Sequence, residues 1–94
     1  MKLSSDYNLE LEALRKAIDE VDMEILQLLR KRTDIVQLVR EVKRKHDIPI
    51  YQPERFQQLL AHLQHEAQKK DLSPELITKI WTAIHEQSLK HQQS

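Results

Sequence analysis

The stretch LEALRKAIDEVDMEILQLLRKRTDIVQLVREVKRK, residues 11–45, decides the fold of this chain. Its apolar residues recur at alternating spacings of three and four, the heptad pattern of a helix that packs along another helix. This seam consists of Leu11, Leu14, Ile18, Val21, Ile25, Leu28, Ile35, Val39 and Val42. At about 1.5 Å per residue, such a helix would be roughly 55 Å long, more than a compact domain of this mass can cover. We therefore expect a second copy of the chain to cover the seam, in an obligate homodimer.

Two short zones that contain all three prolines separate this stretch from two further helical patterns. Pro53 opens the second pattern, and Ser73 followed by Pro74 opens the third, as an N-cap and a first helical residue. Glycine is absent, so hairpins and glycine-rich phosphate loops are not expected. The prediction is an all-α fold and a single domain over residues 1–94, with helices over about 8–46, 53–70 and 73–91.

Composition excludes several classes of function. Lys+Arg 15 and Asp+Glu 15 balance, so the net charge does not favour a nucleic acid or an anionic membrane as partner. Cysteine is absent, which excludes disulfides, thiolate metal sites and thiol nucleophiles. No apolar run approaches the roughly 20 residues of a membrane span, and the N-terminus lacks the apolar core of a signal peptide. We expect a soluble, cytoplasmic protein.

Polar residues interrupt the apolar faces at several points. Arg32 occupies the seam position between Leu28 and Ile35, and helical periodicity places Lys43 on the same face as Arg32. A cation drawn toward an apolar interior needs either a protein carboxylate or an anionic ligand as partner. In the third helical pattern, the polar residues Ser88 and Gln92 continue the apolar stripe. The second helical pattern begins with a further cation, Arg55.

Arg15 adds a geometric argument for a site shared between two chains. It lies 17 residues before Arg32, which is roughly 25 Å along a helix, so one small ligand cannot contact both in the same chain. In an antiparallel pair of these long helices, Arg15 of one chain could approach Arg32 of the other.

Three other interpretations are weaker. The second and third helices carry four histidines, His62, His65, His85 and His91. A pair at i, i+3 spacing, such as His62 and His65, could bind a metal, but neither cysteine nor a carboxylate cluster accompanies them. The basic run KRKH at 43–46 could contact phosphates, but no recognition-helix pattern accompanies it. A dimeric coiled-coil interaction module is the strongest non-enzyme alternative, and it predicts that Arg32 is ion-paired within the protein.

The chain resembles the all-helical, AroQ-type chorismate mutases from about residue 9 to residue 92. The resemblance rests on the LRxxID start at 14–19, the spacing of Arg32 and Lys43, the proline before the second helix, and the SxxxQ pattern at 88–92. It implies a dimer of three-helix chains with intertwined first helices. It also implies two active sites, each completed by one residue of the partner, that convert chorismate to prephenate in aromatic amino acid synthesis without metal or other cofactor.

The resemblance also assigns roles to individual residues. Arg15 would come from the partner chain, and Lys43 and Gln92 would donate to the ether oxygen of the substrate. The remaining members of the implied site are Arg32, Arg55, Ser88, Gln52 and Phe56.

Position 56 departs from the family pattern. Most members have a glutamate there, which accepts a hydrogen bond from the C4 hydroxyl of chorismate, and many have an acid where this chain has Gln52. Phe56 cannot accept that bond. Either Phe56 only begins the apolar stripe of the second helix, or the substrate differs. The isochorismate-pyruvate lyases, which share the fold and lack the glutamate, are the alternative, with isochorismate as substrate and salicylate and pyruvate as products.

Overall fold

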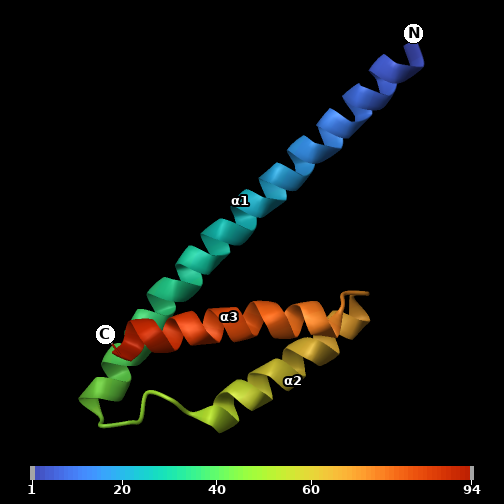
Figure 1. Cartoon of the computed structure of the whole chain (residues 1–94). Coiled ribbons are helices and arrows are strands. Elements are labelled where there is room, and N and C mark those ends of the chain that lie inside the picture. Colours follow the sequence, from blue (N-terminus) through green and yellow to red (C-terminus); the bar gives the residue numbers. More distant parts are fainter. Residues whose placement is uncertain (1, 94) are drawn as a thin grey trace. The chain divides into compact units, whose positions relative to one another are not determined.

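A computed structural model describes the backbone of residues 2–93 and the side chains of residues 7–90. Its elements are α1 (Lys2–Lys45), α2 (Pro53–Lys69) and α3 (Pro74–Gln93), and no strand occurs among the described residues. Figure 1 shows α1 as one uninterrupted helix and α2 and α3 as a helical pair. The predicted all-α fold, with one long and two shorter helices, is confirmed.

The long helix extends further toward the N-terminus than the sequence suggested. α1 has 44 residues and begins at Lys2, whereas the seam alone predicted a start near residue 8. Its last turn holds three basic residues, which interact favourably with the negative end of the helix dipole; they are Lys43, Arg44 and Lys45.

Both α1 and α2 end in a turn that proteins usually build with glycine. After α1, Asp47 takes a φ of 55°, and the Ile48 amide donates to the Lys43 carbonyl at 2.8 Å. After α2, Asp71 takes the same φ. This is the Schellman arrangement, and aspartate is among the few residues besides glycine that enter the left-handed region at modest cost. The two aspartates therefore end the helices in a chain that has no glycine.

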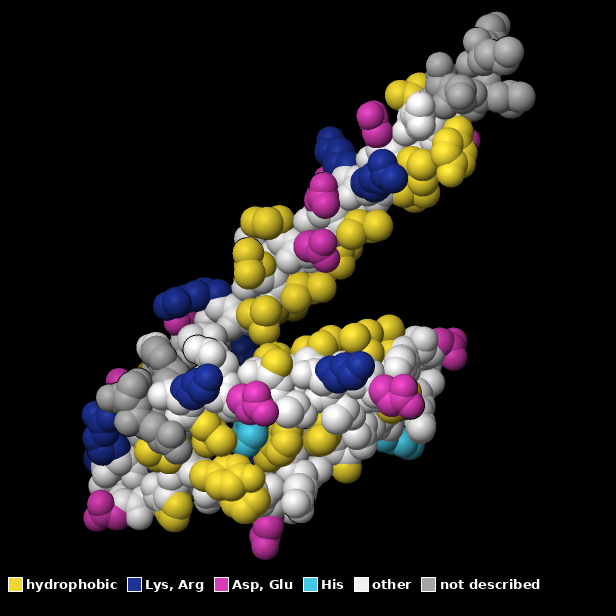
Figure 2. Space-filling model, in the orientation of Figure 1, with side chains coloured by type: hydrophobic (Ala, Val, Ile, Leu, Met, Phe, Trp, Pro, Cys, Tyr) yellow, Lys and Arg dark blue, Asp and Glu magenta, His cyan; other side chains and the backbone are white. Residues whose placement is uncertain are grey.

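The chain forms two compact units, Met1–Ile35 and Val36–Ser94. The first is the N-terminal part of α1. Most of its described seam residues are well exposed, from 50% at Ile25 to 63% at Leu28. Figure 2 shows hydrophobic side chains in a row along α1, with charged side chains beside them. A contiguous apolar stripe of this length is a surface that a further partner covers in stable proteins.

The second unit contains the end of α1 and the helical pair. α2 packs against α3, and the described residues buried at their contact are Ala67 (3% exposed) and Ile77 (8%). Gln64 Nε2 donates to Thr78 Oγ1 at 2.8 Å across the same contact. None of the described large side chains is completely buried. Such a thin core leaves a single chain with little to stabilise it.

Among the described residues, no helix is both long enough and apolar enough to cross a membrane.

Candidate active site

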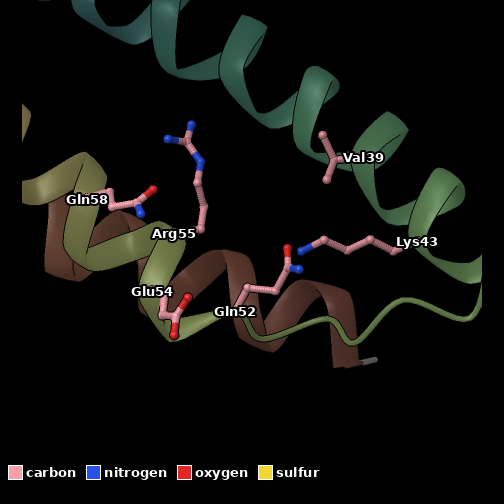
Figure 3. A pocket seen from close by; sticks show the side chains of 6 residues that line it. All are labelled: Val39, Lys43, Gln52, Glu54, Arg55 and Gln58. Carbon is pink, nitrogen blue, oxygen red and sulfur yellow. The ribbon is translucent and has the colours of Figure 1, made fainter.

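An open pocket of about 370 Å³ lies in the second unit. One wall comes from the last turns of α1 and the other from the linker and the first turns of α2 (Figure 3). Its lining consists of Val39, Lys43, Gln52, Glu54, Arg55 and Gln58.

Helical periodicity explains why these side chains meet. Val39 and Lys43 are four residues apart on α1 and share one face, and Arg55 and Gln58 are three apart on α2. Figure 3 shows that Lys43 and Arg55 extend from their two helices into the space between them. The pocket is therefore lined by two cations from different elements and by one carboxylate, that of Glu54.

Lys43 is held in place by the linker that follows α1. Its Nζ donates a hydrogen bond of 2.7 Å to the carbonyl oxygen of Ile50, and its side chain is half-buried. An ammonium group carries three donors, so two remain for a ligand. The contact restricts a flexible side chain and aims its charge at the pocket.

Among the described residues, no carboxylate forms an ion pair with Arg32, Lys43 or Arg55. Ion pairs of the described residues include those of Arg30 with Asp34, and of Lys69 and Lys70 with Glu66. The internal ion pair that a plain coiled-coil module predicts for Arg32 is thus not formed by the described carboxylates of the chain. A pocket with two such cations suits an anionic ligand.

The structure brings only part of the predicted site together. Lys43, Gln52 and Arg55 line the pocket. Arg15, which is exposed, and Arg32, which is half-buried, belong to the other unit.

The two α3 residues of the predicted site are not among the pocket residues. Ser88 is half-buried on α3. The Gln92 side chain lies outside the described residues.

Phe56 packs against α3 and is not among the residues that line the pocket. Its ring stacks on the imidazole of His85, with centroids 4.0 Å apart and planes 12° from parallel. Phe56 is half-buried, in agreement with the interpretation that it begins the apolar stripe of α2. The stack gives the ring a packing partner within the chain.

Sequence reasoning missed two polar residues of the pocket. These residues are Glu54 and Gln58. The spacing of three residues from Arg55 to Gln58 was the available signal for Gln58. No group of three His, Asp or Glu side chains that could hold a metal ion occurs in the described part of the chain.

Comparison with known proteins identifies the family. The sequence model of the family described as chorismate mutase type II matches residues 14–93. This chain belongs to the chorismate mutase type II family. The resemblance to the AroQ-type enzymes is thereby confirmed.

Curated relatives carry related names. The T-protein of Enterobacter agglomerans is 42% identical over 79 residues, which are 84% of this chain and 21% of that protein. The chorismate mutase of Methanocaldococcus jannaschii is 29% identical over 85 residues, 88% of this chain and 86% of that protein. The 4-amino-4-deoxychorismate mutase of Streptomyces pristinaespiralis is 32% identical over 74 residues, 79% of this chain and 57% of that protein. The chain thus spans about a fifth of the length of the T-protein. No solved structure matches the chain.

Proposed function

We propose that this chain is a chorismate mutase, which rearranges chorismate to prephenate for the synthesis of aromatic amino acids. The observation that carries the proposal is the pair Lys43 and Arg55. They come from two helices, line one pocket, and form no ion pair with a described carboxylate. Membership of the chorismate mutase type II family supports the same activity.

The chemistry requires little more than orientation and charge. Chorismate carries two carboxylates, and its enolpyruvyl ether rearranges in one cyclic step: the C–O bond breaks while a C–C bond forms, and no proton moves. The protein must hold the compact conformer of the substrate, which arginine can do through two parallel hydrogen bonds to a carboxylate. It must also stabilise the negative charge that grows on the ether oxygen.

Lys43 suits the second task. Its Nζ is already oriented by the Ile50 carbonyl at 2.7 Å, so its charge needs little reorganisation when the ether bond breaks. Arg55, an exposed residue that lines the pocket, suits the first task by binding a substrate carboxylate. Gln52 and Gln58 add neutral hydrogen-bonding groups to the same wall.

The proposal includes a homodimer with shared sites. The seam of the first unit is exposed over its described length, apart from the half-buried Leu11, and a second copy would cover it. Arg15 of the partner subunit would then complete the site together with Arg32, Ser88 and Gln92. The thin core of the single chain supports an assembly in which folding and association are coupled.

The stacking of Phe56 on His85 favours chorismate over isochorismate as substrate. A phenylalanine that serves packing does not require a substrate with its hydroxyl elsewhere on the ring. Position 56 still lacks the glutamate that accepts the C4 hydroxyl in most members of the family. We therefore expect a mutase roughly 10- to 100-fold slower than members that have the glutamate.

The deciding experiment measures kcat/KM for chorismate and isochorismate on one preparation, with prephenate and salicylate followed separately. A third arm uses 4-amino-4-deoxychorismate, because one relative is named for that compound. We expect prephenate formation to dominate. Salicylate formation a hundredfold faster than prephenate formation would instead identify a lyase.

A binding measurement separates an enzyme from a plain interaction module. A dicarboxylate analogue of the transition state should raise the melting temperature of the protein by mass action. The matched control is Lys43→Gln, which removes the charge from the pocket and should reduce the shift. An unshifted melting temperature at millimolar analogue would favour the interaction module.

A further inference from the structure

The first turn of α2 carries much of the pocket but is poorly capped. Gln52 occupies the N-cap position with φ −123° and ψ 89°, and its side chain makes no capping hydrogen bond. At the start of α3, by contrast, Ser73 Oγ accepts a hydrogen bond of 3.2 Å from the Leu76 amide. Glutamine is not among the residues that cap helices well. Apart from the bond of the Arg55 amide to the Gln52 carbonyl, another side-chain contact could therefore orient Arg55 in that turn.

A cluster of three rings supplies such a contact. The His85 imidazole stacks on Phe56 at 4.0 Å and lies 5.6 Å from the Tyr51 ring at a tilt of 44°. The three rings come from α3, the first turn of α2 and the linker before it. Tyr51 and Phe56 are the immediate sequence neighbours of two pocket residues, Gln52 and Arg55. A single side chain of α3 thus touches both flanks of the uncapped turn.

The linker is also held from the side of α1. Lys43 Nζ binds the carbonyl oxygen of Ile50, the residue before Tyr51. Lys43 is thus connected through the linker to Tyr51, which contacts His85. His85 in turn contacts Phe56, the sequence neighbour of Arg55. His85 therefore contacts the residue that follows the one bound by Lys43. It also contacts the residue that follows Arg55.

We propose that His85 is a positioning residue, which aims Arg55 and Gln52 at the ligand by stacking on Phe56 and contacting Tyr51. The proposal rests on the mutase function for its kinetic consequence, but not for its structural one. The planar ring is the required feature, because a flat face packs on Phe56 with a defined orientation. A branched side chain of similar volume fills the space without fixing that orientation.

The test compares His85→Leu, which removes the ring, with His85→Phe, which keeps it. The matched control is His65→Leu, at an exposed histidine of α2. For His85→Leu we expect kcat to fall about 10-fold while KM changes less than about 3-fold, because a misaligned arginine lowers the fraction of bound substrate in the reactive geometry. His85→Phe and His65→Leu should stay within about 3-fold of the wild type.

Amide hydrogen exchange gives a readout that does not depend on activity. The amides of Arg55 and Phe56 donate to the Gln52 carbonyl at 3.1 and 3.4 Å. Their exchange should rise about 10-fold in His85→Leu and remain unchanged in His85→Phe. The Ile77 amide, bonded to the Ser73 carbonyl at 3.2 Å, is the reference within the same helical pair. If His85→Leu does not fold, His85→Gln replaces it with the same expectation.

Two results would overturn the proposal: unchanged exchange at Arg55 in His85→Leu, or a His85→Phe protein as impaired as His85→Leu. A wild-type protein without mutase activity would refute the proposed function instead, and the exchange data would still decide the role of His85.

Discussion

The N-terminal part of α1 and the α2–α3 pair carry apolar stripes of the same helical kind, but the two stripes differ in how much of their surface is exposed. On α1 the seam residues Ile18 and Val21 are 58% and 51% exposed. Between α2 and α3, Ala67 and Ile77 are 3% and 8% exposed. A stripe becomes a core only where the chain supplies a second surface, and a turn of a few residues supplies it for α2 and α3. For the long helix, the second surface would come from another copy of the chain in the proposed dimer.

The largest effect is expected from placing a charge in the seam. Val21→Asp would bury a carboxylate from each of two chains against apolar neighbours, so the proposed dimer should dissociate and the chains should largely unfold. Sedimentation and circular dichroism measure the two outcomes. Gln27→Asp, which adds the same charge to α1 outside the seam, is the control and should leave both unchanged.

A folded wild-type monomer at micromolar concentration would refute the homodimer. An intact dimer in Val21→Asp would mean that the seam is covered by something other than its own copy.

The next largest effect is expected at Lys43, in the unit that contains the pocket. Lys43→Ala removes the group that we propose as a charged donor to the ether oxygen, and it should lower kcat by two orders of magnitude or more. Lys45→Ala, in the same last turn of α1 and exposed, is the control. Lys43→Gln should keep the fold, which circular dichroism checks. An effect confined to KM would contradict the role assigned to Lys43.

A smaller effect is expected from substitutions of Phe56, which test the packing of α2 against α3. Phe56→Glu loses the stack on His85, so the free energy of unfolding should fall by about 1–3 kcal/mol, while kcat/KM for chorismate should not rise. Phe56→Tyr retains the ring and serves as the control. Chemical denaturation and initial rates give the two quantities. A gain in mutase activity with unchanged stability would mean that this position faces the substrate.

Much of the fold was readable because helical periodicity repeats over many residues. The 3–4 spacing predicted α1, and proline and serine marked the starts of α2 and α3. The helix ends were less visible, because Asp47 and Asp71 adopt the left-handed conformation that usually signals glycine.

The site was only partly readable. Lys43 and Arg55 stood out in the sequence because a cation next to an apolar face needs an anionic partner. Gln58 did not stand out, and His85 stood out only as a possible metal ligand, because periodicity shows which residues share a face but not which neighbouring helix that face meets. Phe56 was ambiguous for the same reason, and only the position of its ring on His85 showed what it contacts.

The last prediction joins the two regions, because Arg15 lies in the first unit and Lys43 in the second. Arg15→Ala and Lys43→Ala homodimers should each be nearly inactive. When the two variants are unfolded and refolded together, about half of the dimers should be mixed by random pairing, and each mixed dimer should hold one intact site and one that lacks both residues. About a quarter of the wild-type activity should therefore return, as initial rates of prephenate formation would show. Mixing the folded dimers without unfolding is the control and should restore nothing until subunits exchange. If mixed dimers form, as native mass spectrometry of a tagged variant would establish, and no activity returns, then Arg15 does not serve the partner's site. The long helix would in that case contribute only its seam.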